Sequence, residues 1–229
     1  MAPDRTVSVV IPAFNAARYL GEALESVRSQ TAPVAEVIVV DDGSTDDTRA
    51  WEARMPGVRW LVKSHEGISA ARNAGASMAT STYLAFLDAD DRWLPGKLAV
   101  QLAAFNDDPA IDLVFGHARQ FRSPELPARP DIRVDTAPVP GLVPGTLLLR
   151  RETFWRVGPF DATWRVGEFI DWYAKAQSLG LKSVTCPDVV LERRVHDDNT
   201  GIRERAAQTD YLRILKAALD RRRAGKERE

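Results

Sequence analysis

The chain has 229 residues, of which 45% are hydrophobic and 28% charged, a composition typical of a globular protein with one large domain or two small ones. The formal net charge of −1 provides no bulk positive field, so nucleic acid is not an expected partner. A single cysteine excludes an internal disulfide framework and a zinc site of several thiolates. The first apolar run, Val7 to Phe14, is too short to span a membrane, so we expect a soluble, cytoplasmic protein.

Short β-branched runs alternate with helical patterns through the first half of the chain. The expected strands are Val7–Ile11, Glu36–Val40, Val58–Val62 and Tyr83–Leu87. Four helices are expected between and after these strands. The first carries Leu20, Leu24 and Val27, and the second runs from a capping Ser44 to Arg54. The third runs from Ser69 to Ala79, and the fourth begins near Pro95. Because strands that alternate with helices form βαβ units, the pattern predicts an α/β fold with a mainly parallel sheet flanked by helices.

The alternation ends after an expected strand at Asp112–Gly116. The next segment, Arg122–Pro144, holds six prolines and shows little periodicity, which is typical of a functional loop or lid. Further elements are expected at Thr146–Leu149 (strand), Glu168–Leu179 (helix) and Val189–Val195 (strand). The pattern predicts a single domain with a nucleotide-binding-like half, residues 1–116, and a more irregular half, residues 117–202.

Residues 203–229 contain nine lysines and arginines and five acidic residues, which predicts a basic helix from about Glu204 followed by a tail. A basic helix on an otherwise acidic chain could touch a membrane surface or an acidic partner. The simpler alternative is a solvated helix end.

Polar residues gather where the expected strands end. Pro12–Asn15, Asp41–Ser44 and Asp88–Asp91 follow the first, second and fourth strands, and ligands of open parallel sheets bind at these carboxyl ends. Asp88 and Asp90 are two residues apart, so in extended chain both carboxylates lie on one side and could share Mg²⁺ or Mn²⁺. The alternative is that residues 88–91 only cap the next helix. The sequence has no GxGxxG or Walker motif, which disfavours dehydrogenases and P-loop proteins.

Several motifs occur together in a fixed order: VSVVIPAFN at Val7–Asn15, QT at Gln30–Thr31, VVDDGSTD at Val39–Asp46, GISAARNAG at Gly67–Gly75, FLDADD at Phe86–Asp91 and VGPFD at Val157–Asp161. Over residues 7–199 the chain therefore resembles the family 2 glycosyltransferases, which have the GT-A fold. The resemblance implies inverting transfer of a sugar from a nucleoside diphosphate sugar, with UDP as the expected carrier. The acceptor could be a saccharide, a peptide or a small molecule.

The resemblance also implies roles for individual residues. Pro12, Ala13 and Phe14 would line the nucleobase pocket, Asp42 would accept the base N–H, Arg72 and Arg194 would contact the donor phosphates or nucleotide, and Asp88, Asp90 and His196 would hold Mn²⁺ or Mg²⁺ on the donor diphosphate. For Arg72 the simpler alternative is a surface helix arginine, and for His196 a loop histidine beside aspartates. His65 and His117 are interpreted as structural or exposed residues, and Cys186 as a strand residue without a redox role.

One position departs from the family pattern. Members usually carry an adjacent Glu-Asp pair whose Asp is the catalytic base, whereas here Phe169 follows Glu168. The base is then Glu168 or Asp171, three residues apart on one helical face. Alternatively, the chain is an inactive sugar-nucleotide-binding or partner protein, or a sugar-nucleotide pyrophosphorylase, although the Gly-rich loop of pyrophosphorylases is missing. Trp164 and Trp172 either offer ring surface to an acceptor or pack in the core.

Overall fold

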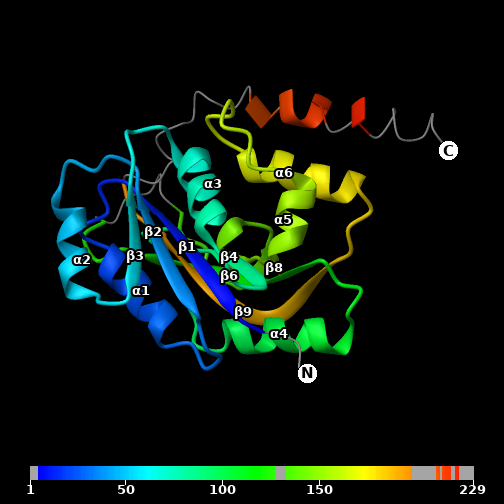
Figure 1. Cartoon of the computed structure of the whole chain (residues 1–229), viewed down its shortest axis with the longest axis horizontal. Coiled ribbons are helices and arrows are strands. Elements are labelled where there is room, and N and C mark those ends of the chain that lie inside the picture. The colour runs from blue at the N-terminus through cyan, green and yellow to red at the C-terminus, as the bar shows by residue number, and fades with distance from the viewer. Residues whose placement is uncertain (1–4, 127–132, 198–209, 212, 218–219, 222–229) are drawn as a thin grey trace.

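The computed structural model describes residues 5–126, 133–197, 210–211, 213–217 and 220–221 (Figure 1). The strands are β1 (Val7–Ala13), β2 (Glu36–Asp41), β3 (Val58–Val62), β4 (Tyr83–Phe86), β5 (Arg92–Trp93), β6 (Leu113–Arg122), β7 (Val139–Gly141), β8 (Leu148–Arg150) and β9 (Ser183–Val195). The helices are α1 (Leu20–Arg28), α2 (Ala50–Arg54), α3 (Ile68–Met78), α4 (Lys97–Asp107), α5 (Arg151–Val157) and α6 (Glu168–Ser178), with 3-10 turns η1 (Asp47–Arg49) and η2 (Pro144–Thr146). The predicted α/β class is confirmed.

The strands form one sheet in the order β3-β2-β1-β4-β8-β6-β9-β5, and β7 pairs with β6. The four strands of the first half are parallel, with Val10 opposite Ile38 of β2 and Phe86 of β4. Strand β8 is antiparallel to both β4 and β6, while β9 runs parallel to β6. The parallel first half brings the carboxyl ends of β1, β2 and β4 to one edge of the sheet.

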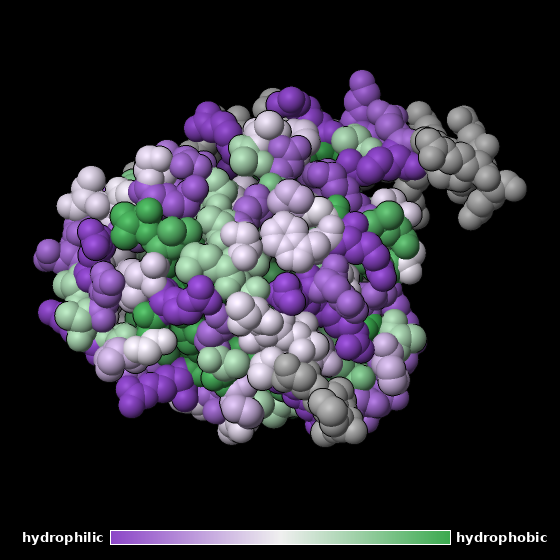
Figure 2. All heavy atoms as spheres, in the orientation of Figure 1, coloured by the Kyte–Doolittle hydropathy of each residue, from purple (hydrophilic) through white to green (hydrophobic). Residues whose placement is uncertain are grey.

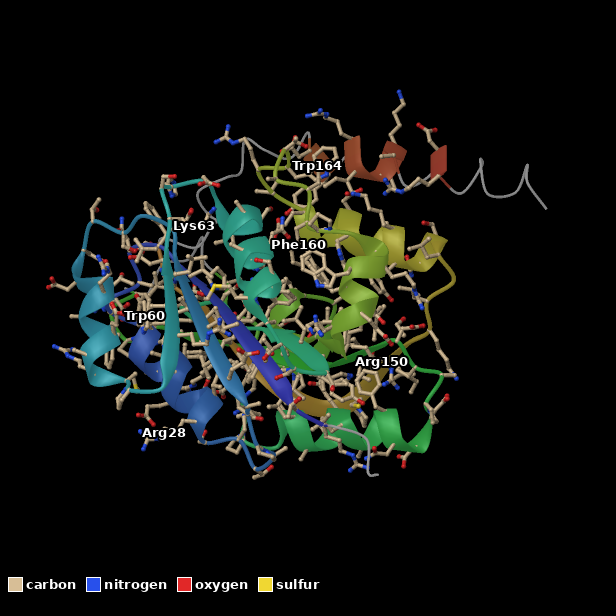
Figure 3. The ribbon with its side chains drawn as sticks, in the orientation of Figure 1. Arg28, Trp60, Lys63, Arg150, Phe160 and Trp164 are labelled. Atoms are coloured by element: carbon tan, nitrogen blue, oxygen red, sulfur yellow. The ribbon has the colours of Figure 1, made fainter. Side chains whose placement is uncertain are left out.

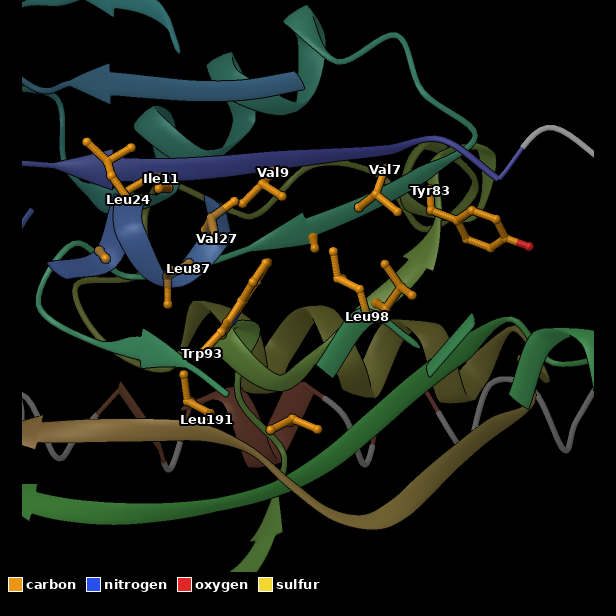
Figure 4. Close-up of a cluster of buried hydrophobic side chains, with 14 of the residues drawn as sticks. Val7, Val9, Ile11, Leu24, Val27, Tyr83, Leu87, Trp93, Leu98 and Leu191 are labelled. Atoms are coloured by element: carbon orange, nitrogen blue, oxygen red, sulfur yellow. The ribbon is translucent and has the colours of Figure 1, made fainter. Parts of the chain in front are cut away.

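Helices cover both faces of the sheet (Figure 1), and alternate residues of the fully buried β1 serve the two cores. Val9 and Ile11 pack with Leu24 of α1 and Leu98 of α4 on one face, as Figure 4 shows. On the other face, Val10 joins a cluster formed with α3, α5 and α6, whose aromatic members are Phe86, Phe115, Phe154, Phe160, Phe169 and Trp172. Figure 2 shows hydrophilic and hydrophobic residues interspersed over the outer surface in this view.

Helix α3 packs very closely on the sheet, as its small residues predict. A Cβ atom built on Gly75 would lie 2.3 Å from Cγ1 of Val10 and 3.1 Å from Cγ2 of Val40. Such distances leave no room for a side chain at this position, so glycine allows α3 to lie directly on β1 and β2. The same helix carries Arg72.

The helix expected from Ser44 begins later than predicted. The Ser44 N–H donates to Oδ1 of Asp41, and Oγ of Ser44 accepts the Asn15 N–H, so Ser44 belongs to the turn after β2. Asp46 is the capping residue, because its side chain accepts the Thr48 N–H at the start of η1. The predicted helix is therefore η1 followed by the five residues of α2.

The second half is more regular than its sequence predicts. Strands β6 and β9 extend well beyond Asp112–Gly116 and Val189–Val195, because they pair with each other over most of their length. The segment Arg122–Pro144 is not structureless throughout, since β7 pairs with Gly116–Ala118 of β6 and Pro144 begins η2. The expected lid falls partly on residues 127–132, which lie outside the described residues.

Within the segment of the expected basic helix, residues 210–211, 213–217 and 220–221 are helical. Its expected start near Glu204 lies outside the described residues. Within the described ranges, no helix is both long enough and apolar enough to cross a bilayer.

Acid should weaken the fold through Glu36, which bonds Ser8 of β1, Arg59 of β3 and Thr80. Burial alone would raise the pKa of Glu36, but these hydrogen bonds hold it at about 2, against an ordinary value of 4.5. Because the folded pKa is the lower one, the stabilisation is present above pH 4.5 and is lost as the pH falls toward 2. Glu36→Gln should cost about 3 kcal/mol of unfolding free energy at pH 7 and less than half of that at pH 3. Urea unfolding at both pH values checks this, and an equal cost at both would contradict it.

Candidate functional site

The ends of β1 and β2 are joined at the edge of the sheet where the candidate residues gather. Pro12 and Ala13 are the last, buried residues of β1, and the Phe14 side chain that follows is 44% exposed. The Asp42 N–H donates to the Ala13 carbonyl oxygen at 2.8 Å. Asn15, in the left-handed region with φ of +49°, accepts the Thr45 N–H on its side-chain oxygen at 2.8 Å. These bonds hold the backbone that presents the exposed Phe14 ring.

The Asp42 carboxylate lies buried beneath the loop that follows β3. Its two oxygens accept the backbone N–H groups of Glu66 and Gly67 at 2.9 and 2.8 Å. Two backbone donors of this loop therefore fix the orientation of the Asp42 carboxylate, which is the predicted acceptor for a base N–H.

His65, interpreted from the sequence as structural or exposed, has a side chain that is 59% exposed and that also lies against this part of the site. Its ring stacks on Phe14 with centroids 4.0 Å apart, and its Nδ1 lies 3.0 Å from Oδ2 of Asp42. The imidazole thus contacts both groups assigned to the nucleobase, so a base that uses this face of Phe14 must displace it. The sequence signal that could have indicated His65 is its position just beyond the end of β3, at the same edge of the sheet as Phe14 and Asp42.

Arg72 lies at the centre of the site and is only 2% exposed. Its two terminal nitrogens donate to Oδ1 of Asp88 and Oε1 of Glu168, both at 2.5 Å. Burial alone would lower the pKa of Arg72, but the two carboxylates outweigh burial and raise it. Arg72 is therefore a charged bridge between the end of β4 and the start of α6, and not a surface arginine.

The structure brings together two of the three expected metal ligands. Nε2 of His196 lies 2.9 Å from Oδ2 of Asp90, whereas Asp88 is bonded to Arg72. Within the described part of the chain, no group of three or more histidine, cysteine, aspartate or glutamate side chains converges as a metal-binding cluster. The tilted ring of Tyr19, 4.9 Å from His196, adds a neighbour that the sequence did not indicate.

Arg194 lies behind the Asp90 backbone. Its Nε donates to the Asp90 carbonyl oxygen at 2.9 Å, and one terminal nitrogen donates to Glu22 at 2.7 Å. The guanidinium carbon lies 4.6 Å from the ring centroids of both Tyr19 and Phe121. This arrangement fixes the turn that carries Asp90.

Glu168 and Asp171 take different partners despite their three-residue spacing. Glu168, the first residue of α6, faces Arg72. Asp171 is 2% exposed, and its two oxygens bind Lys175 at 2.7 Å and Arg221 at 2.8 Å. Only Glu168 of the two therefore lies beside the sheet-edge residues.

Phe169 belongs to the hydrophobic core, where its ring stacks near Trp172 and Tyr173. Trp172 is also a core residue, with its indole N–H donating to the Gly158 carbonyl at 2.7 Å. Trp164, labelled in Figure 3, is covered by Arg213, 5.1 Å from its ring centroid. The core position of Trp172 matches the simpler of the two interpretations of the tryptophans.

The turn before α6 is attached directly to α3. Asn73 donates to the Phe160 carbonyl at 2.8 Å and accepts the Phe160 N–H at 2.9 Å. The motifs around Arg72 and Phe160 are thus bonded to each other, and this places Glu168 opposite the end of β4.

Comparison with known proteins identifies the class of the chain. The sequence profile described as Glycosyl transferase family 2 matches residues 8–158, and the chain belongs to this family. An uncharacterized glycosyltransferase of Nostoc sp. is 33% identical over 180 residues, which are 70% of this chain and 56% of that protein. A chondroitin synthase of Escherichia coli is 34% identical over 113 residues, 48% of this chain and 16% of that protein.

Solved structures show the same architecture. TarS of S. aureus (residues 1–349), in complex with UDP, matches with a TM-score of 0.66 at 22% identity, over 93% of this chain and 65% of that one. The mannosyltransferase PcManGT of Pyrobaculum calidifontis, in complex with GDP-Man and Mn²⁺, matches with a TM-score of 0.63 at 24% identity, over 87% and 61%. The fold is therefore GT-A. The chain spans less than two thirds of the length of each of these proteins.

Proposed function

We propose that this protein is an inverting glycosyltransferase that moves a sugar from a UDP-sugar to an acceptor hydroxyl. The observation that carries the proposal is the Arg72 bridge, which joins the donor-side Asp88 to Glu168 at 2.5 Å on each side. A carboxylate that could take a proton is thereby held next to the strand ends where the donor diphosphate would bind.

The uridine of the donor would bind between Pro12, Ala13, Phe14 and Asp42. Phe14 offers an exposed ring for stacking, and Asp42 offers a buried carboxylate to the ring N–H of a pyrimidine. The UDP complex of TarS supports this nucleotide, whereas the GDP-Man complex of PcManGT makes GDP the competing possibility.

Asp90 and His196, with Asp88 two residues before Asp90, would hold Mn²⁺ or Mg²⁺. The ligand chemistry fits through the carboxylates, because carboxylate oxygens suit Mn²⁺ and Mg²⁺, and the imidazole nitrogen of His196 lies 2.9 Å from the Asp90 carboxylate. When bound, the ion would stabilise the negative charge on the departing diphosphate. Arg194 serves by holding the Asp90 carbonyl, which keeps the ligand-bearing turn in position.

Glu168 would act as the catalytic base. Because Arg72 binds Oε1, the second oxygen Oε2 would accept the proton of the acceptor hydroxyl. The hydroxyl oxygen then bonds to the anomeric carbon from the face opposite the diphosphate, the bond to the diphosphate oxygen breaks, and the configuration inverts. Phe169 does not argue for an inactive protein, since the neighbouring Glu168 supplies the carboxylate. A pyrophosphorylase is not favoured, because the chain belongs to family 2.

The two halves of the domain would contribute different parts of the site. Residues 1–116 contain the nucleotide-side and most metal-side candidates, and residues 117–202 contribute Glu168 and His196. We propose that the second half also binds the acceptor, a saccharide, a peptide or a small molecule.

UDP should bind more tightly with Mn²⁺ than with EDTA, and more tightly than GDP. Asp90→Asn should weaken UDP binding in Mn²⁺ by at least about 10-fold and change it little in EDTA. Loss of a residue that only supports a metal ligand already costs about 10-fold in metal affinity, and loss of a ligand should cost no less. Titration calorimetry measures both, with Asp107→Asn on the exposed end of α4 as the matched control. Equal parental affinity in Mn²⁺ and EDTA would contradict the metal role, and a preference for GDP would contradict the nucleobase assignment.

Glu168→Gln should lower turnover by about 10²–10⁴-fold while UDP affinity is retained, because the amide keeps an oxygen that can accept from Arg72 but cannot take the proton of the acceptor. Turnover is measured as UDP released from UDP-GlcNAc with water as the acceptor. Glu152→Gln, an exposed glutamate in the first turn of α5, is the matched control. Parental turnover in Glu168→Gln would rule out this base, and UDP binding without turnover in the parent would support an inactive protein.

A further inference from the structure

The described C-terminal residues, 210–211, 213–217 and 220–221, pack on the start of α6, and we call them the C-terminal clamp (Figure 1). Ile214 is 2% exposed. A Cβ atom on Gly167 would lie 2.8 Å from Cδ1 of Ile214 and 3.1 Å from the ring of Tyr211. Gly167 precedes Glu168 and has a φ of +80°, so backbone conformation and close packing both favour glycine here.

Polar contacts extend this packing to the loop before α6. Asp210 accepts the backbone N–H of Arg165 at 3.3 Å. The Arg213 guanidinium lies over the Trp164 ring and bonds Asp210 at 3.4 Å. The clamp therefore contacts three of the four residues that lead directly into α6: Trp164, Arg165 and Gly167.

A buried ion pair attaches the far end of the clamp to α6. Arg221 donates to Oδ1 of Asp171 at 2.8 Å, and Lys175 binds the other oxygen at 2.7 Å. Because Asp171 is almost fully buried, its charge needs these cations. Asp171 thus serves as the anchor of the clamp, and the contacts of Arg221 with Asp171 and of Arg213 with Trp164 differ from what a purely membrane-facing basic helix requires.

We propose that the C-terminal clamp positions Glu168 for catalysis, with Arg221 and Ile214 as positioning residues. This inference rests on the proposed function, in which Glu168 is the base. The clamp fixes Gly167 on one side of Glu168 and Asp171 one turn later, so the carboxylate stays within reach of Arg72. A misplacement of about 1 Å at a reacting group can cost about 10²-fold in rate, so the loss of one clamp contact should be visible in kcat.

Arg221→Ala tests the proposal, with Arg221→Lys as the conservative variant and Ile214→Val as a mild variant that also loosens the clamp. Hydrogen exchange is followed at the Asp171 amide, which donates to the Gly167 carbonyl at 3.1 Å. UDP affinity and UDP-GlcNAc turnover are measured in the same preparations. Arg28→Ala, which breaks the exposed ion pair of Arg28 with Glu25 on α1, is the matched control.

Arg221→Ala should exchange the Asp171 amide about tenfold faster and lower kcat about tenfold, while the Kd for UDP stays within about twofold. Arg221→Lys should restore most of both losses, Ile214→Val should show smaller changes of the same kind, and Arg28→Ala should match the parent. The proposal is overturned if exchange is unchanged, or if exchange becomes faster while kcat does not fall. Retained turnover in Glu168→Gln would instead overturn the base assignment, so the two failures are distinguishable.

Discussion

A buried guanidinium between two carboxylates from distant parts of the chain is the interaction on which the site depends. Arg72 is almost fully buried and bonds Asp88 after β4 and Glu168 at the start of α6. A charge buried this deeply costs several kcal/mol unless it is paired, so moving either carboxylate would remove one of the two anions that compensate the guanidinium. The separation between the end of β4 and the start of α6 is therefore linked to one side chain.

Close packing determines where that side chain lies. Gly75 lets α3 rest on Val10 and Val40, and Asn73 bonds the turn at Phe160 through both its donor and its acceptor. Arg72 is thus carried on a helix that is seated on the first half of the sheet and bonded to the second. Packing therefore explains Gly75, and hydrogen bonding within the fold explains Asn73, without any contact between these residues and a ligand.

Local patterns predicted the parallel first half, because its strands are mainly apolar runs that are followed by polar residues at one edge, although β3 also carries Arg59. The same patterns missed β5, β7 and α5, which are short and, for the two strands, defined by pairing with distant β9 and β6. At the site, strand ends indicated Asp42, Asp88 and Asp90. The contacts of Asp171 with Arg221 and of Arg194 with Asp90 span 50 and 104 residues, so spacing alone could not reveal them.

A double-mutant cycle on Arg72→Met and Glu168→Gln measures the central bridge most directly. Unfolding free energies in urea are compared for the parent, both single variants and the double variant. Because the two side chains bond directly in a buried site, their effects should be non-additive by at least about 1 kcal/mol. Additivity within about 0.3 kcal/mol would show that Arg72 and Glu168 act independently, and it would contradict a bridge between the two halves of the site.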